Sequence, residues 1–354
     1  MRFAPLLAAT ILLPTLALGQ SVTVGTATAP RGQAAFGSIV VPPGPDSGLS
    51  IPVAVVNGAR PGPVVALVAG SHGTEYASIV ALQRLIGMLD PKTMAGTAIV
   101  VPLVNLASFR QMIVHLNPVD GKGMNRVYPG DLRGTQSQRA LALMAEQVVK
   151  PAGVIIDLHG GDLDEDLRPY SYLFRGGNAA QDAASGALTL AFGLDHIIVQ
   201  DVDPANPASR GTLSGYALSL GKTVLVAEAG RSGTVVAGDV ALLVDGMLNA
   251  LGHLGMIDRV VRGVERPVWL DGGARVAAEG EGMFVPGVAR GSYVNEGMKV
   301  GLLTDFFGRP VKEVRAPASG VVTFIRGVPS IWPGATLINV GRVLTTPPPY
   351  SKPR

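Results

Sequence analysis

The fold is decided by the stretch from Pro63 to Glu75, which reads PVVALVAGSHGTE. Its first seven residues are apolar, and its last six include Ser71, His72 and Glu75. A short, continuous apolar run is typical of a strand that is buried on both faces, as in a parallel sheet covered by helices. The abrupt change after the run places a histidine and a carboxylate where the predicted strand ends.

Three further segments have the same form. Each is a largely apolar run that ends at a polar residue: 98–104 before Asn105, 154–158 before His159, and 223–227 before Glu228. Helix-like segments lie between the runs, at residues 75–89, 137–149, 181–192 and 240–251. This alternation predicts an α/β fold with an open, largely parallel sheet flanked by helices. Ligands bind beyond the carboxyl ends of such strands, so we expect the polar residues to converge there.

The character of the chain changes near residue 267. Helical periodicity ends, and short β-like pieces alternate with glycines. This pattern predicts a small C-terminal β-sandwich or barrel domain over residues 267–345. We therefore predict a catalytic domain over 20–266 and a loose tail over 346–354.

The N-terminus has the features of an export signal. A basic residue precedes an apolar stretch at residues 3–18, and Ala17 and Gly19 are the small residues that a signal peptidase reads. We predict a signal peptide over 1–19 and an exported protein, periplasmic or secreted. The alternative is an N-terminal anchor, but the stretch is short for a bilayer and two prolines interrupt it. We expect no stable membrane insertion after cleavage.

The composition excludes several classes of protein. Hydrophobic residues make up 47% of the chain and charged residues 16%, which excludes a disordered chain. The net charge is only +3 and the basic residues are scattered, so we expect no nucleic-acid partner. The chain has no cysteine, so a tightly bound transition metal must use His, Asp or Glu. The composition leaves a homo-oligomer open.

Two of the five histidines stand at predicted strand ends. His72 and Glu75 are three residues apart across a strand-to-helix turn, so both can face one point. His159, from another strand end, completes a set of two histidines and one carboxylate, the ligand type of catalytic zinc sites. A His-x-x-Glu pair alone is often structural, but the strand-end placement of all these groups favours a metal. We predict Zn²⁺ bound by His72, Glu75 and His159, with Glu228 as the base that acts on water.

Five motifs also occur together in a fixed order. They are HGTE at 72–75, Asn105 with Phe109 and Arg110, DGKGMNRVYPGD at 120–131, DLHGG at 157–161, and AEAG at 227–230. With these motifs the chain resembles the succinylglutamate desuccinylase/aspartoacylase family, a branch of the zinc carboxypeptidase superfamily. The resemblance implies a carboxypeptidase-like mixed sheet flanked by helices, with a small C-terminal β domain. It also implies the zinc ligands and base named above, and Asn125 with Arg126 as anchors for a substrate carboxylate.

The chain departs from the pattern of that family at two places. Many members carry an Asp two residues before the Asn-Arg pair, where it supports a ligand histidine, whereas this chain has Gly123. Relatives often place an Arg near the developing oxyanion, about five residues before the Asp-Gly step. Here His115 occupies that neighbourhood, and Arg110 is the nearest arginine upstream. Either Arg110 or His115 can take the place of that arginine near the oxyanion, and His115 can also be an ordinary surface residue. Arg110 is included among the predicted substrate-binding residues.

Acidic residues surround His159 in the sequence. Asp157 precedes it by two residues and is either part of the site or a buried structural carboxylate. The acidic run at 162–166 follows it with a spacing unlike that of a calcium loop. We interpret the run as a solvated loop at the rim of the site that disfavours very acidic substrates.

The sequence thus predicts an exported zinc hydrolase. It cleaves the amide bond of small N-acyl amino acids or related amides, so its partner is a small molecule that carries a carboxylate. The first alternative is a zinc carboxypeptidase or amidase that uses the same site on peptides or cell-wall fragments. The second is a binding module without catalysis, which the intact set of His72, Glu75, His159 and Glu228 disfavours.

Overall fold

A computed structural model describes residues 21–346 and residue 348. The predicted signal peptide over 1–19 lies outside the described residues, as do residues 347 and 349–354 of the predicted tail.

The centre of the molecule is a sheet of four parallel strands. In spatial order they are β6 (Ala95–Val101), β5 (Arg60–Ala69), β7 (Val154–His159) and β10 (Thr223–Arg231). These are the four apolar runs of the sequence. Antiparallel strands extend the sheet on both sides: β4 (Leu49–Asn57) and β3 (Gln33–Val41) beyond β6, and β8 (Glu165–Arg175) beyond β10. The predicted α/β fold with a mixed sheet is confirmed, and its four central strands are parallel to one another.

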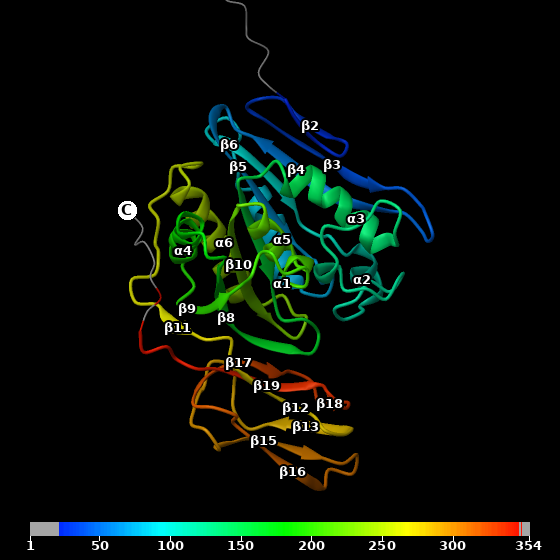
Figure 1. Cartoon of the computed structure of the whole chain (residues 1–354), viewed down its shortest axis with the longest axis vertical. Coiled ribbons are helices and arrows are strands. Elements are labelled where there is room, and N and C mark those ends of the chain that lie inside the picture. The colour runs from blue at the N-terminus through cyan, green and yellow to red at the C-terminus, as the bar shows by residue number, and fades with distance from the viewer. Residues whose placement is uncertain (1–20, 347, 349–354) are drawn as a thin grey trace, which may run out of the picture.

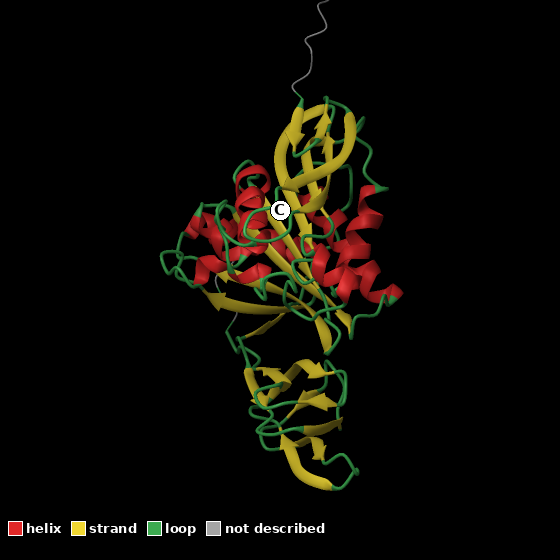
Figure 2. Cartoon of the chain, turned by 90° about the vertical axis from the view of Figure 1, so that its right-hand side faces the viewer, coloured by secondary structure: helices red, strands yellow, loops and turns green. Residues whose placement is uncertain are grey.

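Helices cover both faces of this sheet (Figure 2). Val65 and Leu67 of β5 belong to the core on one face, and Ala66 and Val68 belong to the core on the other. The first face is covered by α1 (Tyr76–Ile86), α4 (Ala179–Phe192) and α6 (Ala237–His253). The second is covered by α3 (Gln136–Met144), its π-helical continuation at Ala145–Val149, and α5 (Leu213–Ser219). Because residues alternate across a strand, a strand buried on both faces must be apolar throughout, as the four runs are.

Several short elements have no counterpart among the predicted ones. They are α2 (Leu106–Gln111), α5, the short 3-10 turns at Met124–Arg126 and Ser209–Gly211, the N-terminal hairpin β1 (Val22–Val24) and β2 (Ala27–Ala29), and β9 (His196–Asp201). Each element is only a few residues long, so the apolar periodicity that predicts a helix or a strand does not develop within it.

The C-terminal region consists of two packed antiparallel layers, which lie below the helices in Figure 1. One layer contains β12 (Ala274–Ala277), β19 (Thr336–Gly341), β17 (Gly320–Arg326) and β14 (Tyr293–Val294). The other contains β16 (Pro310–Arg315), β15 (Lys299–Thr304), β13 (Gly282–Pro286) and β18 (Ser330–Ile331). A separate core that includes Phe284, Leu337 and Ile338 lies between them. The predicted β-rich C-terminal region is confirmed.

The C-terminal strands are continuous with the main sheet. β8 is long enough to pair with β9 along its second half and with β17 at its start, where Glu165 lies opposite Arg326. The predicted boundary at residue 267 falls just before β11 (Val268–Leu270), which pairs with β9. The division into domains therefore stays a prediction, because strands of both regions belong to one sheet.

Among the described residues, no helix has both the length and the apolar character that a membrane span requires.

Candidate active site

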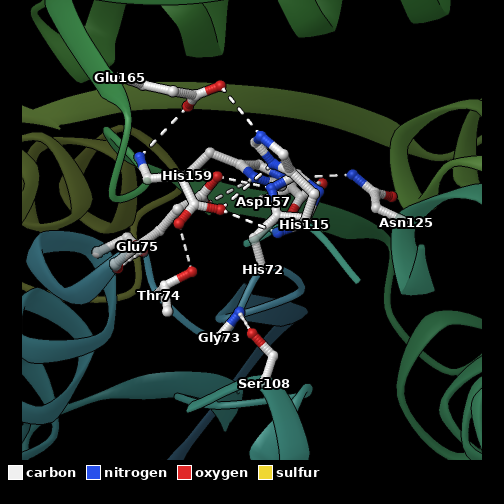
Figure 3. Close-up of polar contacts among 12 residues, drawn as sticks. His72, Gly73, Thr74, Glu75, Ser108, His115, Asn125, Asp157, His159 and Glu165 are labelled. Atoms are coloured by element: carbon white, nitrogen blue, oxygen red, sulfur yellow. Dashed lines mark hydrogen bonds and ion pairs between the residues drawn. The ribbon is translucent and has the colours of Figure 1, made fainter. Parts of the chain in front are cut away.

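His72, Glu75 and His159 meet where two neighbouring parallel strands end (Figure 3). His72 lies in the turn after β5, Glu75 immediately precedes α1, and His159 is the last residue of β7. The Nδ1 atom of His72 lies 2.6 Å from Oε1 of Glu75, and the Nδ1 atom of His159 lies 3.0 Å from Oε2 of the same carboxylate. The three side chains each offer a ligand atom, all within 4.8 Å of one another.

The charges at this point suit a cation. Burial on its own raises the pKa of Glu75, but His72 and His159 beside it lower the pKa to about 2. Burial also disfavours a charged His159, yet the carboxylates of Asp157 and Glu75 hold its pKa well above the usual value. Groups that stabilise a proton at this position also stabilise a metal ion. Two imidazole nitrogens and one carboxylate are the donor set of catalytic zinc sites, so the residues present fit Zn²⁺.

The second nitrogen of His159 has its own partners. Nε2 lies 3.3 Å from Oδ2 of Asp157 and 3.3 Å from Nδ2 of Asn125, whose Oδ1 accepts a 2.8 Å hydrogen bond from the backbone N–H of Leu213. Apart from this ion-pair contact with His159, neither oxygen of Asp157 has a partner within the described part of the chain. When Nδ1 is the metal ligand, Nε2 carries the ring proton and faces Asp157, and the Nδ2 atom of Asn125, itself a donor, is then a neighbour of Nε2 and not its hydrogen-bond partner. Asp157, for which the sequence left two roles open, lies at the site and is also buried.

Glu228 comes from the adjacent strand. It is paired in register with His159 across the β10–β7 ladder, so the two side chains share one face of the sheet. Burial raises the pKa of the Glu228 carboxyl well above its usual value. The nearby His159 lowers this pKa, whereas the carboxylates of Glu75 and Asp157 raise it further. A carboxylate whose pKa is raised toward neutrality is a more effective acceptor of a proton from water.

The cluster opens on two cavities. The larger has a volume of about 1120 Å³ and lies between the main sheet and the C-terminal region, with Arg126 and Glu165 on one side and Arg326 and Trp332 on the other. The smaller, of about 310 Å³, is lined by Asn125 and by residues of α5 and β9. The residues shared by both cavities are His72, Arg126, Tyr172 and Glu228. A substrate that spans the two cavities therefore has its middle at these residues.

Of the predicted substrate-binding residues, the structure brings two to the cavities and leaves one outside. Arg126 lines both cavities, is exposed, and forms no ion pair within the described residues. Asn125 lines the smaller one, but its side-chain atoms already face Leu213 and His159. Arg110 lies on the exposed side of α2 and lines a separate depression, so its prediction as a substrate-binding residue is corrected. Its alternative, His115, lines the larger cavity, with its ring centroid 5.3 Å from that of His72.

Comparison with known proteins agrees with this arrangement. The sequence profile of the succinylglutamate desuccinylase/aspartoacylase catalytic domain matches residues 61–254, which is more than half of the chain. The chain belongs to the succinylglutamate desuccinylase/aspartoacylase family. This is a family of deacylases that act on N-acyl amino acids.

Individual members of the family show similarity over most of their length. The N-alpha-acetyl-L-2,4-diaminobutyric acid deacetylase of Halomonas elongata is 28% identical over 303 residues, which cover 83% of this chain and 86% of the relative. The succinylglutamate desuccinylase/aspartoacylase structure from Rhodobacter sphaeroides superposes with a TM-score of 0.78 at 27% identity, covering 88% of this chain and 96% of that one. The product-bound ectoine utilization protein EutE (DoeB) from Ruegeria pomeroyi gives a TM-score of 0.79 at 25% identity, covering 88% and 95%.

In this family member the acidic run after His159 is not a solvated loop, and that interpretation of the sequence is wrong. Asp162 is 0% exposed and accepts hydrogen bonds from the Thr74 hydroxyl and, at 3.2 Å, from the backbone N–H of His115. Asp164 is 8% exposed, and its Oδ2 lies 3.0 Å from Nη1 of Arg326. The run is buried because β17 packs beside the start of β8 and covers it.

Sequence reasoning missed Tyr170, Tyr172 and Arg326, which line the larger cavity, and it placed Glu165 only in a solvated loop at the rim. The position of Glu165 shortly after a ligand histidine was a signal that could have found it. The other residues lie in ordinary strand patterns, and Arg326 is remote from the motifs in sequence.

Proposed function

We propose that this chain is a zinc-dependent hydrolase that cleaves the amide bond of small N-acyl amino acids that carry a carboxylate. The proposal rests on one observation above all, the convergence of His72, Glu75 and His159 beside Glu228 in a cavity. Membership of a deacylase family supports the reaction type. The relative from Halomonas elongata, whose name gives an N-acetylated amino acid as substrate, supports the substrate class.

The residues of the chain have separate roles in this proposal. His72, Glu75 and His159 hold the ion, and Asp157 keeps the proton of His159 on Nε2. A zinc ion bound there supplies Lewis-acid chemistry, since it polarises a carbonyl and lowers the pKa of water toward about 7.

Glu228 moves the proton. Its carboxylate accepts one from the attacking water as the new C–O bond forms, and passes it to the amine nitrogen as the C–N bond breaks. Arg126 binds the carboxylate of the substrate, because a guanidinium presents two parallel N–H donors to it and Arg126 has no competing ion pair within the described residues.

Export is part of the same proposal. The apolar segment before Gln20 and the small residues near position 19 support a signal peptide, and therefore a periplasmic or secreted enzyme. N-terminal sequencing of the protein from the medium or periplasm of an expressing cell tests this, and an intact Met1 in the exported fraction contradicts it.

The metal is tested by elemental analysis. We expect about one zinc per chain, lost in both His72→Ala and His159→Ala and retained in the control His253→Ala, whose side chain lines neither cavity. Full occupancy in both ligand variants refutes the ligand assignment.

The substrate class is tested on a panel of N-acyl amino acids and dipeptides, with the released amine as readout. The volume of the larger cavity, about 1120 Å³, exceeds that of an acetylated amino acid and is the observation that favours a peptide substrate. Faster cleavage of the dipeptides selects the carboxypeptidase alternative. A zinc-loaded protein that binds these compounds without cleaving any of them selects the binding module.

A further inference from the structure

One residue at the point where the two cavities meet has no role in the proposed function. The residues common to both cavities are His72, Arg126, Tyr172 and Glu228. The first holds the ion, the second binds the substrate carboxylate and the last moves the proton, which leaves Tyr172. A tyrosine offers one O–H donor. A substrate that spans both cavities has its middle at these residues, so its amide lies next to this hydroxyl.

Pairing in the sheet places Tyr172 on the face that carries the base. In β8, Tyr170 lies opposite Glu228 of β10, and Tyr172 lies opposite Val226. Because side chains two residues apart share a face of a strand, Tyr172 and Glu228 are diagonal neighbours on one face of the sheet. Diagonal neighbours are about 7–8 Å apart, which is within reach of an aromatic side chain. Tyr172 and Glu228 can therefore contact neighbouring atoms of one bound substrate.

The ring of Tyr172 is held by two other aromatic rings. It stacks on Phe174, with ring centroids 5.2 Å apart and 12° between the planes. It meets Tyr170 edge-on, at 5.3 Å and 87°. A donor that packing fixes in this way does not have to reorganise during the reaction. Burial raises the pKa of Tyr172 to about 12, so the hydroxyl keeps its proton at neutral pH and is available as a donor.

The hydroxyl of Tyr172 is not committed to another group. Within the described residues its one hydrogen-bond contact is with the hydroxyl of Tyr170 at 3.5 Å, longer than the usual O–H···O distance of about 2.5–3.0 Å. Tyr170 is 6% exposed and lines the larger cavity alone. Tyr172 is the more exposed of the two and lines both cavities. Of the two hydroxyls, that of Tyr172 therefore faces the substrate.

The residues that the sequence suggested for the developing oxyanion do not offer a free donor there. Arg110 lines neither cavity. His115 lines the larger one, but both of its ring nitrogens face carboxylates: Nδ1 is 3.2 Å from Asp162, and Nε2 is 3.7 Å from Glu165. A donor aimed at the position of the oxyanion is a large contribution to catalysis of acyl transfer. The hydroxyl of Tyr172 is the group that can supply it.

We propose that Tyr172 is a catalytic residue whose hydroxyl donates a hydrogen bond to the carbonyl oxygen of the substrate amide as that oxygen becomes an oxyanion. In this step the oxygen of water forms a bond to the carbonyl carbon, the π electron pair moves onto the carbonyl oxygen, and a proton of the water passes to Glu228. Because the negative charge on the carbonyl oxygen grows during the step, the hydrogen bond from Tyr172 is strongest in the transition state. This inference rests on the proposed function and adds a residue to it.

The variant Tyr172→Phe tests the hydroxyl alone, because it removes one oxygen atom and keeps the ring. With the best substrate of the N-acyl amino acid panel, kcat should fall at least about 10-fold, toward the roughly 10²–10³-fold cost of losing one oxyanion donor. KM should stay near the wild-type value, since an interaction made only in the transition state lowers kcat and kcat/KM equally. Zinc per chain and the free energy of unfolding at pH 7 should be unchanged.

A second measurement does not depend on turnover. A phosphonamidate analogue of the same substrate is a tetrahedral, anionic mimic of the intermediate, and calorimetry gives its affinity for the zinc-loaded protein. Tyr172→Phe should weaken binding of this mimic by about the factor lost in kcat, while the affinity for the released amino acid stays within about twofold. Tyr293→Phe, which removes an exposed hydroxyl outside both cavities, is the matched control and should change neither affinity.

The possible failures are distinguishable. Wild-type kcat in Tyr172→Phe, a loss confined to KM, or equal weakening of the mimic and the amino acid overturns the inference and leaves the proposed function intact. Loss of zinc in Tyr172→Phe also overturns it, because the tyrosine then acts through the metal site. A larger loss in Tyr170→Phe than in Tyr172→Phe overturns it as well, since the other hydroxyl is then the donor. A wild type that cleaves no amide and binds the mimic no better than the substrate refutes both the inference and the proposed function.

Discussion

Glu75 and Glu228 lie in the same cavity, yet replacing each by glutamine should have opposite consequences. Glu75 contacts both histidine Nδ1 atoms, at 2.6 and 3.0 Å, so the neutral amide of Glu75→Gln removes a charged ligand and should weaken zinc affinity by more than about 100-fold. Glu228→Gln leaves the three ligands in place and should retain about one zinc per chain. It cannot accept a proton, so its turnover should fall by roughly 10²–10⁴-fold.

The stability of the metal-free protein should separate the two variants as well. The imidazoles lower the pKa of the buried Glu75 from 4.5 to about 2. This shift corresponds to about 3 kcal/mol of stability, present above pH 4.5 and lost as the pH falls toward 2. Glu75→Gln should therefore cost about 3 kcal/mol at pH 7. Burial raises the pKa of Glu228, so its charge is unfavourable in the fold, and Glu228→Gln should leave stability unchanged or increase it.

Three measurements on each variant complete this comparison: zinc per chain, kcat at saturating substrate, and the free energy of unfolding of chelator-treated protein in guanidinium chloride. Glu281→Gln serves as the control for a surface glutamate. The reasoning is refuted if Glu228→Gln loses its zinc or keeps near wild-type turnover. It is equally refuted if the two variants change the stability of the metal-free protein in the same direction and by the same amount.

Three further changes test other parts of the site. Arg126→Ala should raise KM by about 10- to 100-fold while Arg110→Ala, outside both cavities, leaves it unchanged, and equal effects in steady-state kinetics contradict the placement of the two arginines. Asp157→Asn should lower zinc affinity about 10- to 100-fold, measured by competition with a chelator, because His159 loses the partner of its Nε2 proton; an unchanged affinity rules this role out. Burial raises the pKa of Tyr172 from 10.0 to about 12, so the unfolded chain loses this proton first and stability falls as the pH rises from 10 to 12. Tyr172→Phe should remove about 2 kcal/mol of this loss of stability at pH 12. The loss is measured as the difference between the free energies of unfolding at pH 9 and pH 12. An identical loss in wild type and in Tyr172→Phe counts against the raised pKa of Tyr172.

The choice between Arg110 and His115 shows where prediction from the sequence stopped. The two residues are five positions apart, and either can reach a nearby site in an extended chain. In the structure α2 turns Arg110 outward, and Met112 and His115 then adopt positive φ angles of 53° and 59°. These left-handed residues reverse the chain and bring His115 into the cavity. Non-glycine residues rarely adopt such angles, and the hydrogen bond from the His115 backbone to the buried Asp162 helps to hold this one in place.

The sequence by itself determined the four buried strands and the position of the zinc-ligand candidates, because an apolar run and its polar end are both local patterns. It also indicated Glu228, since the same pattern places that residue at the same edge of the sheet. Whether the acidic residues after His159 are buried and paired was decided only by the tertiary structure. Asp164 is buried and paired because β17 brings Arg326 beside the start of β8, and this contact joins segments about 160 residues apart. Glu165, next to it, has no Lys or Arg partner among the residues that the structure describes. Whether a carboxylate is paired depends on packing between distant strands, which no local pattern encodes.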